Sequence, residues 1–245
     1  MAREVSSITR VGTSEPFELQ VARDQSYKHA TLFKYGYNSN IINVEETIWD
    51  GGGEYSYPSS AVAMTVTSAS GATDSGIKVL VSGLDSSYAE LTEEVTLNAS
   101  GTATTSGLFL RVFRAYVSGS SEPAGNITIT NSSTTYAQIT AGENQTLMAV
   151  YTVPAAKTLY INHGTATHGT DTAGAFMTVR FKVRSFGGVF RTAVKVDVTG
   201  GELLFPFQYP LKITEKSDVE VTAICNKNQT NAVAATFEGV LVSDA

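Results

Sequence analysis

Strict alternation of apolar and polar side chains is the sequence feature that most limits what this chain can fold into. In the segment 177–184 (MTVRFKVR), Met177, Val179, Phe181 and Val183 occupy every second position, with Thr, Arg, Lys and Arg between and after them. Successive side chains of a strand point to opposite faces of a sheet, so a period of two predicts a strand with one buried face.

A second alternating segment follows at 190–198, after the short connection SFGG at 185–188. Two glycines in so short a connection predict a β-hairpin. The Thr-, Val-, Ser- and Gly-rich composition favours strands throughout, because β-branched residues fit a pleated surface. We therefore expect an all-β chain of antiparallel sandwich or jelly-roll modules. Further strands are predicted at 61–68, 76–83, 88–98, 107–118, 125–131, 146–153, 157–163, 217–225 and 233–242.

Composition excludes several classes of function. The 245 residues carry 17 Lys and Arg against 23 Asp and Glu, a formal net charge of −6, with no basic cluster that could neutralise phosphates. We therefore expect no nucleic-acid partner. A single cysteine cannot form a disulfide framework, and no apolar run approaches a membrane span of about 20 residues. A soluble protein made in a cytoplasm is expected, with no membrane partner.

The first fifty residues lack sustained alternation, yet they hold many large apolar groups. We predict that residues 1–50 form an extended arm, which lies along its own domain or along a neighbouring subunit. Two sandwich modules are expected to follow, at 51–143 and 144–245, with one elaborated jelly roll as the alternative. The predicted interface residues of the arm are Phe17, Leu19, Phe33, Tyr35, Tyr37 and Trp49.

Two further groups of side chains are candidates for contacts. Arg180, Lys182 and Arg184 share one face of the predicted hairpin. They form either a solvated strand face or a docking surface for an acidic neighbour, where complementary charge sets the register of two partners. Trp49 and the nearby tyrosines 55 and 57 either anchor the arm or stack on sugar rings.

Catalytic and metal-binding motifs are not found in the sequence. His163, His168 and Asp171 have side chains that can bind zinc or iron, but their spacing along a strand and turn disfavours convergence on one ion. Glu93 and Glu94 are adjacent on a predicted strand, so they point to opposite faces and cannot act as an acid and base pair. No enzymatic activity, cofactor or metal site is therefore predicted.

Several short motifs resemble a group of virion structural proteins of tailed bacteriophages, especially marine ones. The resemblance extends over nearly the whole chain, and the order of the motifs is more specific than any one of them. It implies a β-rich particle component present in many copies, located at the particle surface and assembled in the host cytoplasm. The motifs are EPFELQVAR at 15–23, TIWDGGG at 47–53, VSGLD at 81–85, AGENQT at 141–146 and YTVPAAK at 151–157.

The resemblance and the arm together favour a capsid decoration (cement) protein, which binds the outside of the major capsid shell. Its expected partners are the major capsid protein and other copies of itself, with a trimer favoured because capsid surfaces offer threefold positions. The alternative is a tail- or fibre-associated component, such as an adaptor or a receptor-binding part. A polysaccharide depolymerase is a remote third possibility.

Overall fold

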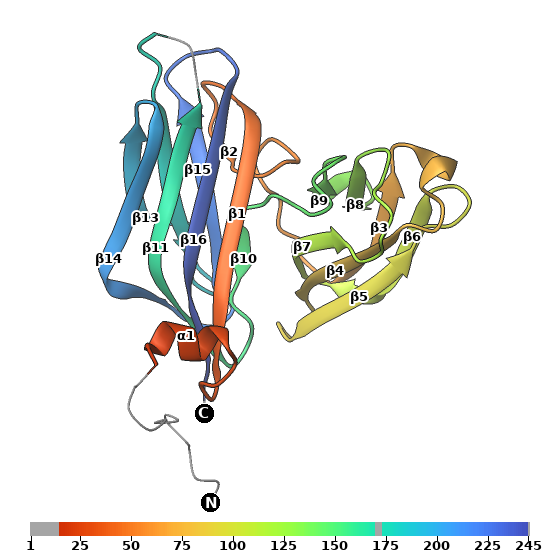
Figure 1. The fold of residues 1–245 in the computed structure, drawn as a ribbon, viewed down its shortest axis with the longest axis horizontal. Helices are drawn as coiled ribbons and strands as arrows, with labels where there is room; N and C mark the ends of the chain where they lie inside the picture. Colours follow the sequence, from red (N-terminus) through yellow and green to blue (C-terminus); the bar gives the residue numbers. More distant parts are fainter. Residues whose placement is uncertain (1–14, 170–172, 245) are drawn as a thin grey trace, which may run out of the picture.

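The computed structural model describes residues 15–169 and 173–244. Within them the chain is all-β and antiparallel, as the alternation predicts, apart from one six-residue helix and a short 3-10 turn. Figure 1 shows two modules side by side, joined by two chain crossings. We call them the terminal module, which both ends of the described chain build, and the inserted module.

The terminal module is a sandwich of two sheets, drawn on the left of Figure 1. One sheet has the strand order β1-β16-β11-β14, and the other has the order β10-β15-β12-β13, with β2 also paired to β15. The helix α1 precedes β1 and crosses the end of the first sheet. The elements are α1 (Phe17–Ala22), β1 (His29–Ile41), β2 (Glu46–Thr47), β10 (Val150–Thr152), β11 (Lys157–Gly169), β12 (Met177–Arg184), β13 (Arg191–Val198), β14 (Gly201–Ile213), β15 (Asp218–Cys225) and β16 (Asn231–Ser243).

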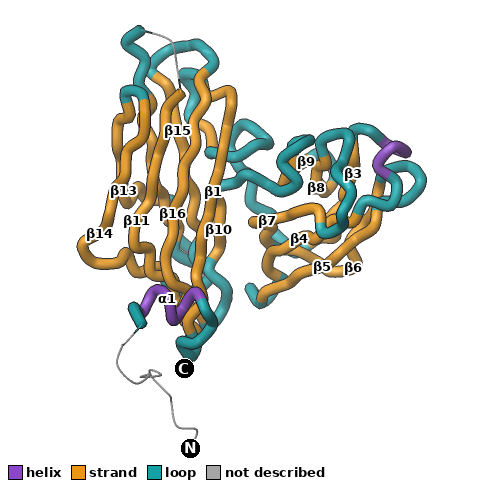
Figure 2. The backbone as a smooth tube through the Cα atoms, in the orientation of Figure 1, coloured by secondary structure: helices purple, strands orange, loops and turns teal. Residues whose placement is uncertain are grey.

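The inserted module lies between β2 and β10 in the sequence, and it also consists of two sheets (Figure 2). Their strand orders are β6-β3-β8-β9 and β5-β4-β7. The elements are β3 (Val62–Ser68), the 3-10 turn η1 (Gly71–Asp74), β4 (Lys78–Leu84), β5 (Glu90–Thr96), β6 (Thr102–Phe109), β7 (Arg111–Val117), β8 (Ile127–Asn131) and β9 (Thr134–Ile139).

Each module has its own hydrophobic core, built from the inward positions of alternating strands. In β16, for example, Val233, Ala235 and Phe237 are buried while the residues between them are half-buried. Phe237 meets Phe181 of the opposite sheet edge-on, with ring centroids 5.5 Å apart. The predicted hairpin is confirmed, because β12 and β13 pair antiparallel on either side of the glycine-containing turn.

The arm expected over residues 1–50 is corrected by the position of β1. This strand pairs with β16 over its length, from His29 opposite Val242 to Ile41 opposite Asn231. Much of the expected arm is therefore a strand of the terminal module rather than an appendage. The terminal module thus takes in residues well outside the 144–245 expected for it, while residues 1–14 lie outside the described part of the chain.

The strand expected over 107–118 is two strands in the structure. The chain turns at Leu110, so β6 ends in one sheet of the inserted module and β7 begins in the other. The Leu110 backbone N–H donates to the carbonyl of Leu84 at this corner. Apolar side chains on both faces of the segment reflect this change of sheet.

Gly36, on the inward side of β1, lies against the backbone of the residues that follow β2 and precede β10. A Cβ atom at this position would lie 2.3 Å from the carbonyl oxygen of Ile48 and 2.4 Å from the backbone nitrogen of Ala149. Both neighbours are fully buried. Glycine is required here because backbone atoms occupy the space of a side chain.

We expect Gly36→Ala to lower the free energy of unfolding by about 1–3 kcal/mol, since backbone must shift to admit the methyl group. Urea unfolding followed by circular dichroism would measure the loss. Gly119→Ala is the matched control, because its nearest neighbouring atom would be 4.0 Å away. Equal stability of the two variants would show that Gly36 is not in close contact with this backbone.

Candidate functional site

The outward side of the sheet β1-β16-β11-β14, which we call the outer face, carries the aromatic residues of β1. Phe33, Tyr35 and Tyr37 pair with Glu238, Thr236 and Ala234 of β16, whose side chains alternate with the buried core positions. Phe33 is 62% exposed and Tyr35 is 38% exposed, while Tyr37 is half-buried. Three of the predicted interface residues thus lie in one row on one surface.

The helix α1 extends this apolar surface. The ring of Phe17 packs edge-on against His29, with centroids 5.4 Å apart, and His29 shares a face with Phe33 because the two are four positions apart on β1. Phe17 and Leu19 remain about half exposed. Further across the outer face, Nε2 of His163 contacts the carboxylate of Glu238. The outer face therefore presents aromatic groups beside a histidine and carboxylate pair.

Trp49 lies in a different environment from the other predicted contacts. It is only 3% exposed, belongs to the core of the inserted module, and donates its indole N–H to the carbonyl of Gly53. Its ring meets Tyr55 edge-on at 5.4 Å. Trp49 is a core residue, which corrects the expectation of a surface contact. Buried in this way, neither ring is available to stack on a sugar.

Each cation of the basic face expected on β12 contacts a carboxylate of the same chain. Arg180 and Lys182 both contact the carboxylate of Glu45, at 2.9 and 2.5 Å. Arg184 forms an ion pair with Asp218 at 2.6 Å. Glu45 and Asp218 each serve two cations, so the face keeps an excess of positive charge. Docking of an acidic neighbour on this face stays a prediction.

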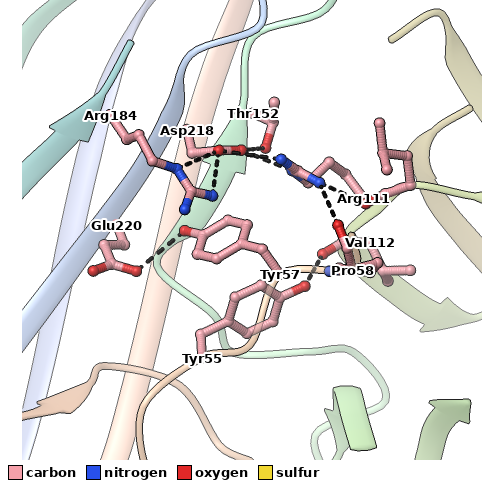
Figure 3. Close-up of polar contacts among 10 residues, drawn as sticks. Tyr55, Tyr57, Pro58, Arg111, Val112, Thr152, Arg184, Asp218 and Glu220 are labelled. Carbon is pink, nitrogen blue, oxygen red and sulfur yellow. Dashed lines mark hydrogen bonds and ion pairs between the residues drawn. The ribbon is translucent and has the colours of Figure 1, made fainter. Parts of the chain in front are cut away.

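The most polar buried site in the described structure lies between the two modules, and we call it the junction (Figure 3). Asp218, at the start of β15, accepts five hydrogen bonds: two from Arg111 of the inserted module, two from Arg184, and one from Thr152. Arg111 also donates to the carbonyls of Pro58 and Leu110. Side chains of Arg111 and Asp218 are only 8% and 4% exposed.

Two tyrosines of the connecting segment complete the junction. The Tyr55 hydroxyl donates to the carbonyl of Val112 at 2.7 Å, and the Tyr57 hydroxyl donates to Glu220 at 3.1 Å. The guanidinium of Arg111 lies 5.2 Å from the centre of the Tyr57 ring. Polar side chains of each module therefore form hydrogen bonds or ion pairs with groups of the other module. These contacts offset the free-energy cost of burying the charged groups.

Sequence reasoning identified Arg184 but missed Arg111 and Asp218. Arg111 is an isolated charge in the apolar run GLFLRVF, and Asp218 precedes the run VEVTAI. A lone charge in a run that otherwise reads as core is the available signal, since charged side chains are rarely buried without a partner. The sequence does not show which two such charges meet.

We expect Asp218→Asn to destabilise the protein by about 3 kcal/mol or more, because it leaves Arg111 buried without its counter-ion. Thermal and urea unfolding would measure the change. Glu94→Gln is the matched control, since it makes the same acid-to-amide change in the exposed Lys78–Glu94 pair and should alter stability little. Similar losses in the two variants would contradict the buried, shared role of Asp218.

Glu220 at the junction and Lys34 on β1 have pKa values shifted toward the uncharged form. Burial raises the pKa of Glu220 to about 7, nearby Glu54 raises it further, and Lys182, Tyr57 and Arg184 oppose the shift. Burial, with Arg114 nearby, lowers the pKa of Lys34 to about 7. Lys34 reaches inward from β1 and donates to the carbonyl of Phe113 in β7. Glu220 and Lys34 therefore both contact the other part of the chain through groups whose charged forms are costly to bury.

The raised pKa of Glu220 predicts a dependence of stability on pH. Its pKa moves from 4.5 to about 7, so the folded state retains a proton that the unfolded state loses, and stability falls as pH rises between these values. Glu220→Gln keeps an acceptor for Tyr57 but does not ionise. We expect the free energy of unfolding of this variant, minus that of the natural protein, to increase between pH 4 and pH 8 by at most about 3 kcal/mol.

Urea unfolding at a series of pH values would measure this difference. Glu94→Gln is the control, because hydrogen bonds from Ser118 and Lys78 lower the pKa of Glu94 and its variant should not gain stability with rising pH. A pH-independent difference between Glu220→Gln and the natural protein would contradict the raised pKa.

The structure places the two candidate metal-binding histidines on opposite faces. His163 points to the outer face, whereas His168 is buried at 3% exposure, and Asp171 lies outside the described residues. Among the described residues there is no group of three or more His, Cys, Asp or Glu side chains that could hold a metal ion. The described part of the chain also contains no helix long and apolar enough to cross a membrane.

No protein-family model and no curated protein match the chain. Among solved structures it is similar to that of the infectious bursal disease virus Gx strain, at 14% identity and a TM-score of 0.28, over 88% of this chain and 73% of that one. It is similar to the PBSX exported protein XepA at 12% identity and a TM-score of 0.20, over 86% and 84%.

A third similar structure is described as the triple jelly roll fold and turret assembly in an archaeal virus. The identity is 9% and the TM-score 0.23, over 89% of this chain and 60% of that one. TM-scores this low do not establish a common fold. The fold assignment therefore rests on the sheets of the chain itself.

Proposed function

We propose that the chain is a non-enzymatic structural protein of a tailed-bacteriophage virion, a capsid decoration protein that binds the outside of the major capsid shell. The observation that carries this proposal is the outer face, where α1 and β1 expose a row of apolar side chains on a rigid sheet. The order of the phage-like motifs along the sequence supports the same class of protein. No catalytic arrangement is needed for this role.

The chemistry of the outer face suits a protein partner. Phe33 and Tyr35 are large, rigid and exposed, and such residues are enriched in the energetically dominant parts of interfaces. Phe17 and Leu19 widen the same surface. Because these side chains are supported by a paired strand, little conformational entropy is lost when a partner covers them.

The other edge of the same sheet is suited to contacts between copies. In β14, Leu204 is 56% exposed and Tyr209 is 80% exposed, and Pro206 and Pro210 lie within the strand. Prolines on an edge strand limit open-ended strand addition, so association through side chains is favoured. We propose that the protein forms a homo-oligomer, with a trimer favoured, through this edge while the outer face at β1 contacts the shell.

Replacing Phe33 and Tyr35 together by serine should reduce the copies bound per particle at least tenfold, because it removes the apolar centre of the contact. Quantitative gel densitometry of purified virions would measure the occupancy. Leu108→Ser with Val189→Ser is the matched control, since these exposed residues, 54% and 70%, lie away from the outer face. Unchanged occupancy of the Phe33 and Tyr35 variant would remove the outer face from the proposal.

The same densitometry of unmodified virions tests the type of particle protein. A decoration protein is present in hundreds of copies, because it repeats over the capsid surface. A count of about a dozen would contradict decoration and favour the tail- or fibre-associated alternative. Absence from purified particles would overturn a virion role altogether.

A further inference from the structure

A pocket of about 490 Å³ opens beside the junction, between the two modules. Its lining comes from five separate segments, represented by Tyr57 of the connecting segment, Tyr88 and Arg111 from two segments of the inserted module, Arg184 and Phe186 around the β12–β13 turn, and Lys216 before β15. The volume is within the range of small-molecule sites, which are often found between domains. The outer face described above is not part of this pocket.

The pocket has an excess of positive charge. Arg111, Arg184 and Lys216 line it together with a single acid, Asp218. Glu220 lies on the other side, where it accepts the hydrogen bond of Tyr57 (Figure 3). Because Asp218 already accepts five hydrogen bonds from within the chain, it has little capacity left for a ligand.

Donors in the pocket remain available to an anion. Arg184 binds Asp218 through Nε and Nη2, and its Nη1 has no acceptor among the described residues. The Lys216 ammonium likewise has no acceptor in the described chain, and it lies 5.5 Å from the centre of the Phe186 ring. An arginine and a lysine with free donors can hold one carboxylate or phosphate group.

An aromatic wall stands beside these donors. The rings of Tyr88 and Phe186 meet edge-on with centroids 5.7 Å apart, and Phe186 is 65% exposed on the hairpin turn. Exposed aromatic rings next to cations provide an apolar surface for a flat or ring-shaped ligand. A bare inorganic anion would use the cations but leave this wall uncovered.

We propose that this pocket binds a small organic carboxylate that carries one ring, with the carboxylate at Arg184 and Lys216 and the ring against Phe186 and Tyr88. Such a ligand touches both modules at once, because Tyr88 belongs to the inserted module and Lys216 to the terminal module. Its binding therefore stabilises the junction. This ligand site is additional to the proposed role in the virion and does not depend on it.

Isothermal titration calorimetry of the full chain tests the site, with glucuronate and benzoate as the two kinds of ring-bearing carboxylate. We expect at least one of them to bind with a millimolar or lower Kd and to raise the melting temperature. Glucose supplies a ring without a carboxylate, and inorganic phosphate supplies an anion without a ring. Both are expected to bind at least tenfold more weakly than the better carboxylate.

Lys216→Gln and Phe186→Ala should each weaken binding of that carboxylate at least fivefold. Phe186 is exposed and Lys216 is half-buried, and neither belongs to a hydrophobic core, so circular dichroism should show an unchanged fold. Lys212→Gln, an exposed lysine on β14, is the control and should bind normally. The proposal is overturned if neither carboxylate binds, if phosphate binds equally well, or if the Lys216 and Phe186 variants bind like the control.

Discussion

The arrangement of the two modules depends on one buried carboxylate, Asp218. It forms ion pairs with Arg111 from the inserted module and Arg184 from its own module, so that both guanidinium groups have an acidic partner. Removing charges from water costs several kcal/mol per ion, and excellent geometry with additional hydrogen bonds is needed to offset this cost. The carbonyls of Pro58 and Leu110 and the hydroxyl of Thr152 supply those bonds. This network joins the two modules through side chains of both.

Much of the fold could be predicted from the sequence wherever one face of a strand is apolar and the other polar. The hairpin β12–β13 and the strand β16 are of this kind. Strand β1 was missed because its pattern is inverted: Phe33 and Tyr35 point outward, while Lys34 and Gly36 point inward. The polarity of a residue in this strand then no longer indicates whether it is buried, and the sequence of the segment shows no regular pattern of buried positions. Pairing with β16, which lies almost 200 residues away, makes it a strand.

Strand β14 was missed for a different reason. Its sequence GELLFPFQYPLKI has apolar groups on both faces and two prolines, so no period of two stands out. Prolines are tolerated there because β14 is at the edge of its sheet, where fewer backbone donors are needed. Edge position is a property of the tertiary fold. A local pattern therefore cannot distinguish such a strand from a loop.

Whether an aromatic side chain is exposed or buried also depends on contacts that are distant in the sequence. Phe33 and Tyr35 were predicted to lie at an interface. The reason was that an apolar segment without regular alternation is expected to pack against another surface. Trp49 lies in the same apolar segment of the sequence but is buried, because the chain at this point enters the core of the inserted module.

The topology of the fold determines that Phe33 and Tyr35 are exposed while Trp49 is buried. β1 has one face on the sandwich core and one face open, while Trp49 enters a second core that the intervening strands enclose. The inverted pattern of β1 is informative for this reason. A strand that points lysine and asparagine inward and aromatic rings outward forgoes burial of the rings in its own module, and a partner surface that covers them recovers the hydrophobic free energy.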